Sequence, residues 1–505
     1  MRTAQTPIPP IAARVVRGDC RGSRLIERGK PLSASVIWWW QERWFEEAGL
    51  DVWTGDVVPH HINTSSFSAV RHARIAVAWV RSLDARPTEG WLPGRSALPV
   101  IEFGAGNGLF AHRFLRAFRK YIGPSSMPRI RYMLSDLSEA RLAALRAARP
   151  VQEAEARGEL QLMRYAIGPG HPLPLERLDG LPLLAIANYV FDGLPADAYE
   201  IEDGELFALT PQVRLPADHL ATEDPLSVLE LDWEREAIDP VGCRDAALMR
   251  DYLALGCDGC ALVPRGALTC LEACLATRCQ ELLVLAADRG TLPGDPLVGT
   301  PLTLVWHGSF SIDVNFDVIA RWVGERGGEA MATRSPGSSH VSLLGLVGAS
   351  LDDRPLLRDA WLQGFDELGP NDYLAIKNAA IVQPPGDVWT VLSFLRLSGH
   401  DERLWLYLLA DLVSSLERHG RGDAAVQQAV RHAVEEVRAN ALLDPHGALE
   451  FGVAQVCAAL GDWQGAVQAC RASLAIEADD DVEELLELCQ HALDDDGREV
   501  HEVYR

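Results

Sequence analysis

The 505-residue sequence contains no apolar run that approaches the roughly 20 residues a membrane-spanning helix needs. Its first ten residues are polar and rich in proline, and they lack the apolar stretch of a secretory signal. The sequence therefore predicts a soluble, cytoplasmic protein with no membrane partner.

Positive charge is scarce, because 47 Lys and Arg face 71 Asp and Glu and leave a net charge of −24. Nucleic-acid binding proteins need clustered basic side chains, so the balance argues against that class. The deficit is uneven. Residues 1–150 carry 22 basic and 12 acidic side chains, whereas residues 151–350 carry 13 and 30 and residues 351–505 carry 12 and 29. The two acidic parts favour a basic peptide as partner.

Metal-ligating patterns are also weak. Five of the ten cysteines lie between Cys257 and Cys279, and Cys257 and Cys260 have the two-residue spacing that zinc sites use. The other three follow at steps of four and five residues in a segment that begins with helical periodicity, so buried reduced thiols are the better interpretation. No metal is expected.

What the chain does contain is a three-part pattern of elements. Residues 1–95 hold an aromatic helix over Ser33–Gly49 and are expected to form a helical segment that covers the site. Residues 96–350 alternate short apolar strands with helices, which is typical of a doubly wound, Rossmann-like parallel sheet, with a hairpin insertion near 197–265. Residues 351–505 show only amphipathic helices.

One part of the helical region has a repeat-like spacing. Gly452, Leu460-Gly461-Asp462-Trp463 and Ala466 follow the pattern of a tetratricopeptide repeat. The sequence thus predicts helix hairpins of a repeat domain at the C-terminal end of the chain.

The strongest chemical motif is the turn after the apolar strand Leu98–Phe103. It contains Gly104, Gly106 and Gly108, which allow a tight turn and close approach by a ligand. Glycines alone suit both a dinucleotide and S-adenosylmethionine. Glu102, at the end of the strand, favours the sulfonium and amino group of S-adenosylmethionine over a pyrophosphate. The dinucleotide fingerprint also places its third glycine three residues after the second, and this chain has no glycine at that position. We therefore expect a methyltransferase in which Glu102 and the three glycines hold the methionine end of the cofactor.

Polar residues end the next strands as well. Asp136 ends a second strand, where a carboxylate accepts the ribose hydroxyls of an adenosyl cofactor, unless it serves only as a cap beside Ser138. Asn188 and Asp192 follow a third apolar strand. Both are expected to orient the acceptor, Asn188 also to contact the cofactor, and Asp192 to accept a proton, although an aspartate before a glycine also suits a plain turn.

Two weaker candidates complete the predicted site. The turn Tyr165–Gly168 follows another strand and is a candidate contact for adenine. His60 and His61 lie in a polar loop that could close over the site, although surface histidines are more often bystanders.

These motifs, in this order, resemble the MidA family of S-adenosylmethionine-dependent methyltransferases. The matching segments are Glu102–Gly108, Asp136-Leu137-Ser138, Asn188–Pro195, Gly55-Asp56, Thr64–Phe67, the hairpin Tyr199–Leu209 and Phe310–Phe316. The resemblance spans roughly residues 35–350 and implies a class I methyltransferase fold. It also implies a protein substrate, because mitochondrial members methylate an arginine of a respiratory complex I subunit.

The chain departs from the family pattern at the acceptor side. Tyr189 stands where the family has Glu, and Gly193 stands where it has Ala. Asp313 and Asn315 stand where it tends to have His and Asp. Without that Glu, one of the two carboxylates expected to bind a guanidinium is missing. The sequence therefore leaves open whether arginine is the methyl acceptor.

The sequence thus predicts a methyltransferase that modifies a protein or peptide side chain. A small-molecule methyltransferase and a non-catalytic scaffold with the same fold are the alternatives. The oligomeric state is open, and a homodimer is one option.

Overall fold

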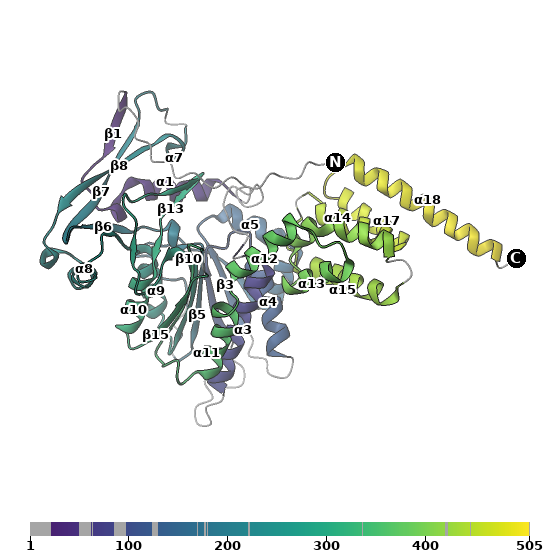
Figure 1. Ribbon diagram of the computed structural model, residues 1–505, viewed down its shortest axis with the longest axis horizontal. Helices are drawn as coiled ribbons and strands as arrows, with labels where there is room; N and C mark the ends of the chain where they lie inside the picture. The colour runs from purple at the N-terminus through teal and green to yellow at the C-terminus, as the bar shows by residue number, and fades with distance from the viewer. Residues whose placement is uncertain are drawn as a thin grey trace. The chain divides into compact units, whose positions relative to one another are not determined.

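The computed structural model describes residues 22–49, 62, 64–84, 97–123, 130–168, 170–175, 178, 180–220, 223–335, 337–419, 423–444 and 446–503 (Figure 1). It divides into two compact units. The first is formed by Met1–Asn63, Ile75–Asn107 and Ile122–Glu367, and the second by Thr64–Arg74, Gly108–Tyr121 and Leu368–Arg505. The three predicted domains follow one another along the chain, whereas each of these two units is made of three separate segments. The predicted domain boundaries therefore stay a prediction.

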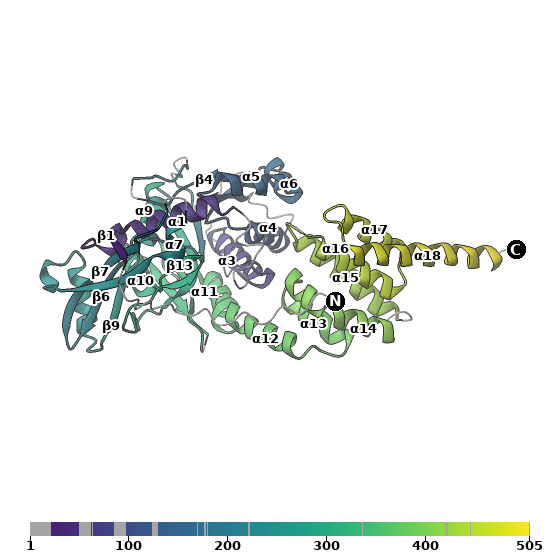
Figure 2. The ribbon, with the colours of Figure 1, turned by 90° about the horizontal axis from the view of Figure 1, so that it is seen from above.

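The first unit is built around an eight-stranded sheet in the order β15-β16-β10-β5-β2-β3-β4, with β14 beside β10. Figure 1 labels β15, β10, β5 and β3, and Figure 2 labels the edge strand β4. The strands are β2 (Leu98–Phe103), β3 (Ile130–Asp136), β4 (Leu160–Arg164), β5 (Leu183–Asn188), β10 (Leu282–Thr291), β14 (Val314–Asn315), β15 (Glu329–Thr333) and β16 (His340–Val347). Strands β4, β3, β2, β5 and β10 pair in parallel, and β16 is antiparallel to β10. This is the Rossmann order 3-2-1-4-5 with an antiparallel strand added toward one edge, so the predicted α/β core is confirmed.

The parallel strands are buried along nearly their whole length. Ile101, Met133 and Val284 come from three of them and share one core with Cys270 and Trp322. Strands that are covered on both faces need continuous apolar sequence. These strands could therefore be predicted from the sequence. The helices of this unit are α1 (Val36–Glu47), α5 (Glu139–Ala147), α6 (Arg149–Ala156), α7 (Pro225–Val228), α8 (Ala246–Leu253), α9 (Arg265–Ala276), α10 (Phe316–Gly324) and α11 (Pro355–Trp361).

A second, antiparallel sheet belongs to the same unit. Its strands are β1 (Ser23–Glu27), β6 (Asp197–Glu202), β7 (Glu205–Pro216), β8 (Glu230–Ala237), β9 (Gly259–Val263) and β11 (Leu297–Val298). The hairpin between β6 and β7 turns at Asp203 and Gly204, which both have positive φ (52° and 78°). Asp-Gly suits this two-residue turn, whose twist matches that of the strands. A short hairpin, β12 (Val305–His307) with β13 (Ser309–Ser311), lies outside both sheets.

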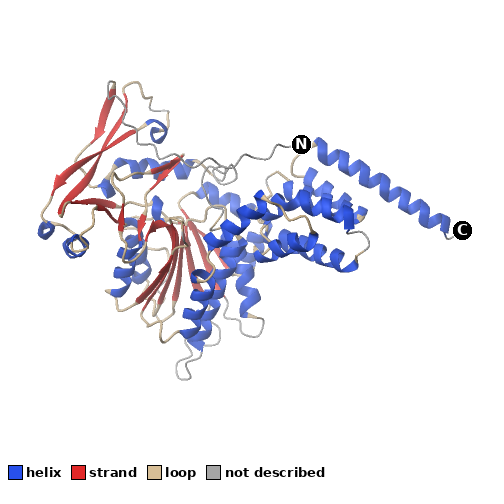
Figure 3. Cartoon of the chain, viewed as in Figure 1, coloured by secondary structure: helices blue, strands red, loops and turns tan. Residues whose placement is uncertain are grey.

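The described residues of the second unit form helices and connecting loops and no strand (Figure 3). Its own helices are α12 (Pro370–Val382), α13 (Val388–Leu397), α14 (Glu402–His419), α15 (Ala424–Asn440), α16 (Ala448–Leu460), α17 (Trp463–Leu474) and α18 (Asp480–Val503). The first part of α3 (Ser66–Asp84) and nearly all of α4 (Leu109–Ile122) also belong to it. The predicted C-terminal helical region is therefore confirmed. Among the described residues, no helix is long and apolar enough to span a membrane.

Candidate active site

The predicted site residues of the first unit meet at the carboxyl ends of β2, β3 and β5. From β2 the chain continues outward to β3 and β4, and β5 then starts the other half of the sheet beside β2. The direction reverses between β2 and β5, and ligands of open α/β sheets bind in the crevice at such a point. Glu102, Asp136 and Asn188 therefore lie where the fold expects a ligand.

The glycine turn after β2 adopts the conformation that glycine allows. Gly104 has φ +71°, and a Cβ on it would lie 2.8 Å from Cγ2 of Val190, which follows β5. Ala105 N donates to the carbonyl oxygen of Ser135 at 2.8 Å, which ties the turn to β3. Gly106 (φ 52°) and Gly108 (φ 71°) follow, and α4 starts at the next residue. The turn thus presents bare backbone to a ligand at the end of β2.

Glu102 is buried (4% exposed) and accepts a 2.7 Å hydrogen bond from the Tyr132 hydroxyl. Burial raises the pKa of Glu102 to about 8, although the hydrogen bond from Tyr132 acts in the opposite direction. No basic side chain is among the groups that shift this pKa. A bound cation would lower it, so Glu102 suits the positive end of S-adenosylmethionine.

Asp136 is buried and is already engaged. Its Oδ1 accepts hydrogen bonds from Arg141 Nη1 at 2.5 Å and Ser138 N at 2.9 Å. Arg141 in turn donates to the carbonyl oxygens of Phe45 and Gly49. Both of these hydrogen bonds fall on Oδ1, and Oδ2 accepts none from the described residues, so a ribose hydroxyl could bind to Oδ2 while Oδ1 keeps the local role. Ser138 caps α5 as expected, accepting from Arg141 N.

Asn188 ends β5 with both side-chain atoms, Oδ1 and Nδ2, buried and without a hydrogen-bond partner. A buried amide without partners costs about 1–3 kcal/mol, so such a group marks a place where a ligand supplies the missing bonds. Together with the bare turn at Gly104 and the uncompensated Glu102, this orphaned amide fits S-adenosylmethionine, whose amino and carboxylate groups would bind there.

Asp192 forms a carboxyl pair with Asp288, a residue that sequence reasoning missed. Asp192 N donates to Asp288 Oδ2 at 3.1 Å, and the two side chains share a hydrogen bond. Burial and the Asp192 charge raise the pKa of Asp288 well above its ordinary value, and burial also raises the pKa of Asp192. Two buried carboxyl groups this close do not both ionise readily, and the larger rise, at Asp288, makes Asp288 the member that keeps a proton more readily.

A histidine and an arginine flank the pair. His307 Nε2 lies 2.8 Å from Ser311 Oγ, and burial lowers the pKa of His307. Arg289 follows Asp288 on β10 and binds Asp313 at 2.7 Å. Asp288 lies inside β10, just beyond the residues that pair with β5, so the strand-end rule that identified Asp136 does not single it out. His307 lies on the β12–β13 hairpin, without a sequence signal of its own. The arrangement can hold a cation and take up a proton.

Tyr189 and Gly193 have specific local roles. Tyr189 has φ 52°, rare for an aromatic residue, and stacks on His340 with ring centroids 5.2 Å apart. Gln41 of α1 donates to the Gly193 carbonyl at 3.0 Å and accepts from Phe310 N at 2.9 Å. The aromatic helix predicted near the N-terminus thus contacts the turn that carries Asp192.

The structure describes the contacts of some of the remaining predicted residues and does not describe others. The Tyr165 hydroxyl donates to the His171 carbonyl and its ring packs against Phe103, so the adenine contact stays a prediction. Asn315 caps α10 and donates to the Leu262 carbonyl. His60 and His61 lie outside the described residues.

No metal cluster forms among the described residues, and the nine described cysteines are free thiols. Burial raises the pKa of the Cys260, Cys270 and Cys274 thiols, as expected of inert core cysteines.

Residues 73–236 match the family model described as "Putative S-adenosyl-L-methionine-dependent methyltransferase". The matched segment contains the glycine turn, Asp136, Asn188 and Asp192. The match confirms the predicted activity class, a methyltransferase, and its cofactor, S-adenosylmethionine.

Two solved structures from Burkholderia thailandensis are among those that match the chain. One, of an uncharacterised protein, has 15% sequence identity and a TM-score of 0.38, and the alignment covers 66% of this chain and 90% of that one. The other, solved with bound S-adenosyl-homocysteine, has 14% identity and a TM-score of 0.36 over 65% of this chain and 97% of that one. No functionally curated protein matches the chain.

Proposed function

We propose that the protein methylates a nitrogen in a side chain of a protein or peptide. The observation that carries the proposal is the buried Asp192–Asp288 pair at the carboxyl ends of neighbouring strands β5 and β10. S-adenosylmethionine supplies an electrophilic methyl group, and the residues of this chain supply the position and charge for the acceptor.

The net charge of the pair suits a cationic acceptor. An ammonium or guanidinium group binds against one carboxylate with a second, protonated carboxyl beside it. Asp288 thereby provides a second carboxyl group although Tyr189 stands in the family's Glu position. This supports arginine among the acceptors, alongside other basic side chains.

A nitrogen that gains a methyl group must also release a proton. Asp192, whose pKa is raised by burial, is placed to receive it, with His307 and Ser311 beside it. Transfer would break the bond between the methyl group and the sulfur of S-adenosylmethionine, with its electrons staying on sulfur, and S-adenosyl-homocysteine would be the leaving product. The proton of the acceptor nitrogen would pass to the Asp192 carboxylate, and the N–H bonding electrons would stay on the nitrogen.

A peptide-binding repeat domain would suit such a substrate, and we propose that α16 and α17 form a tetratricopeptide-like hairpin. Gly461 (φ 77°) ends α16, and Asp462 caps α17 by accepting from Gly465 N at 3.0 Å. A Cβ on Gly452 would lie 2.9 Å from Leu409 Cδ2, so any larger residue would have to displace that side chain of α14. Stacked helix hairpins present concave surfaces that bind extended chains.

Transfer of tritium from labelled S-adenosylmethionine tests the proposal. The full chain is incubated with a lysate of its host, and proteins are then separated from small molecules. Label in a protein band with the wild-type chain, and its loss with the Asp192→Asn variant, is the expected result. Label in small molecules alone would contradict the protein substrate and favour the small-molecule alternative.

A further inference from the structure

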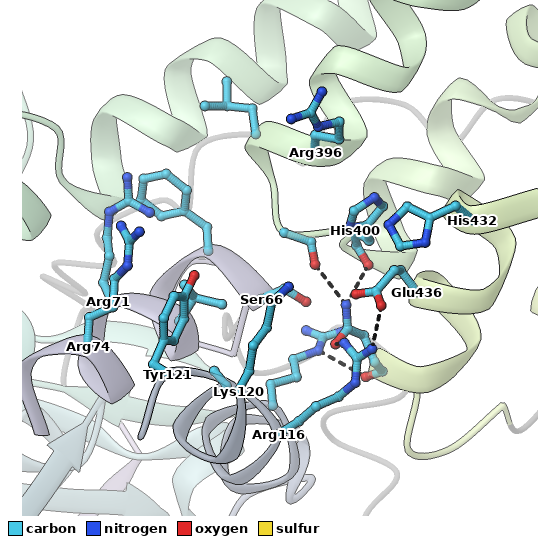
Figure 4. A pocket seen from close by; sticks show the side chains of 17 residues that line it. Ser66, Arg71, Arg74, Arg116, Lys120, Tyr121, Arg396, His400, His432 and Glu436 are labelled. Atoms are coloured by element: carbon cyan, nitrogen blue, oxygen red, sulfur yellow. Dashed lines mark hydrogen bonds and ion pairs between the residues drawn. The ribbon is translucent and has the colours of Figure 1, made fainter. Parts of the chain in front are cut away.

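The second unit contains a cavity of about 480 Å³ that the methyltransferase chemistry does not use (Figure 4). It is lined by residues of α3, α4, α13 and α15, all within that unit. Its volume lies in the range of small-molecule sites. Of the residues predicted to hold the cofactor, Gly108 alone belongs to this unit, and it does not line the cavity.

Basic side chains dominate the lining, although the chain as a whole has a net charge of −24. The lining includes six Arg and Lys side chains and one carboxylate, Glu436; the six are Arg71, Arg74, Arg113, Arg116, Lys120 and Arg396. Two of the six are neutralised within the unit. Arg116 pairs with Glu436 at 2.9 Å, and Arg113 lies 3.4 Å from Asp401.

The other four cations have no carboxylate partner among the described residues. Arg74 and Lys120 lie on α3 and α4, and Arg396 comes from α13. Arg71 lies over the Phe67 ring and donates only to the Leu368 carbonyl. Burial, together with the charge of Arg74, lowers the pKa of Arg71 to about 10. Four unpaired cations around one cavity repel one another, and a bound anion would relieve that repulsion.

A buried donor without a partner points to the same kind of ligand. The Ser66 hydroxyl, in the first turn of α3, is buried and has no hydrogen-bond partner among the described residues. Arg113 Nη2, by contrast, lies 3.6 Å from Glu402 Oε2. Anions bind favourably at the start of a helix, where backbone N–H groups and the helix dipole both favour negative charge. The cavity thus offers hydrogen-bond donors as well as charge.

The charge and shape of the cavity favour phosphate over carboxylate. Arginine presents a planar fork that binds phosphate through two parallel hydrogen bonds, and three of the four unpaired cations are arginines. A ligand with two phosphate groups carries a charge of roughly −3 to −4 at neutral pH, which matches four cations. An extended nucleic acid would need a basic surface longer than a cavity of this size in an acidic chain.

We propose that this cavity binds a small molecule carrying two or more phosphate groups, held by Arg71, Arg74, Lys120 and Arg396 with a hydrogen bond from Ser66. The site is separate from the cofactor residues and takes a different class of ligand.

Calorimetric titration of the full chain with tripolyphosphate tests this site. We expect saturable binding at least about tenfold tighter than that of sulfate at equal ionic strength. The double variant Arg74→Gln/Lys120→Gln removes two exposed cations and should weaken tripolyphosphate binding about tenfold or more. Arg131→Gln/Arg149→Gln removes the same charge from exposed positions of the first unit and should leave binding unchanged.

Three outcomes would overturn the proposal. They are an absence of saturable binding, equal weakening by both double variants, and tighter binding of a short single-stranded RNA or of a glutamate-rich peptide than of tripolyphosphate. Ser66→Ala provides an independent check, because it removes a hydroxyl that has no partner in the protein. It should leave the melting temperature unchanged and weaken tripolyphosphate binding.

Discussion

The backbone N–H of Asp192 donates to a carboxyl oxygen of Asp288 at 3.1 Å, and this bond joins the turn after β5 to the neighbouring strand β10. It brings two carboxyl groups together in a buried place, where ionising both is unfavourable. Burial raises the pKa of both groups, and the rise is larger at Asp288. The pair is therefore asymmetric, and substitutions at the two positions should have different effects.

Asp192→Asn removes the charged member and should lower the rate of methyl transfer about 10²-fold or more. Asp288→Asn preserves both roles of the protonated member, since the amide oxygen accepts from Asp192 N and the amide nitrogen donates to the Asp192 carboxylate. It should change the rate by less than about tenfold. Initial rates of tritium incorporation into protein compare the two, and equal losses would show that the assignment of the proton is wrong.

Binding of S-adenosylmethionine should depend on pH through Glu102. Its pKa of about 8 in the free protein should fall when a cation binds, so binding below pH 8 releases a proton. Affinity should rise from pH 6 to pH 8 and level off above that. Calorimetry in buffers of different ionisation enthalpy measures the proton release. The Glu102→Gln variant should bind with little pH dependence, and an unaltered pH profile in that variant would exclude Glu102 as the source.

Glu102 should also make the stability of the free protein depend on pH. Its contribution to stability should fall as pH rises, whereas the affinity for S-adenosylmethionine should rise. Because folding raises the pKa of Glu102 from 4.5, the free folded protein holds this proton more tightly than the unfolded chain does. The contribution of Glu102 to the free energy of unfolding should therefore fall as pH rises from about 4.5 to about 8. Denaturant titrations of the wild type and Glu102→Gln across this range isolate that contribution as the difference between the two curves.

Gly104→Ala should disrupt the glycine turn for two reasons. The positive φ costs roughly 1–2 kcal/mol, and the new Cβ would lie 2.8 Å from Val190. Gly158→Ala is a matched control, because Gly158 has φ +70° and open space around its Cβ position. Denaturant titration should show a larger loss of stability for Gly104→Ala, and adding Val190→Ala should recover part of the difference. Equal losses at the two glycines would mean that the contact with Val190 is unimportant.

A buried ion pair should dominate the stability of the first unit. Arg354, fully buried, binds Glu281, which also accepts from Trp79 Nε1 at 3.3 Å. Arg354→Ala leaves that carboxylate buried and unpaired and should destabilise the protein by about 3–5 kcal/mol. Arg358→Ala breaks an exposed pair with Asp352 and should change the free energy of unfolding little. Denaturant titrations that give similar values for both variants would contradict this assignment.

Features set by local sequence could be predicted well. The apolar strand before Gly104 and the helix Ala448–Leu460 match the structure because burial on both faces, or on one helical stripe, leaves a regular pattern. Asp136 and Asn188 were found because strand ends carry ligands in this fold.

Features set by tertiary packing could not be predicted. His307 lies on a two-stranded hairpin, and only the folded chain brings it beside Ser311 and Asp192. The cavity lined by Arg71 and Arg396 assembles from helices more than 300 residues apart in the sequence. Counts of basic and acidic side chains over long segments of the chain therefore could not show its positive charge.

The most direct test of where the cofactor binds is a calorimetric titration with S-adenosylmethionine of the wild type and of Asn188→Leu. Both polar atoms of the Asn188 side chain lack a partner in the protein, so Leu, of similar size, should leave the melting temperature unchanged or raise it. Binding of S-adenosylmethionine should nevertheless weaken about tenfold or more. Unchanged affinity in the Asn188→Leu variant would contradict a cofactor site at the carboxyl ends of β2 and β5.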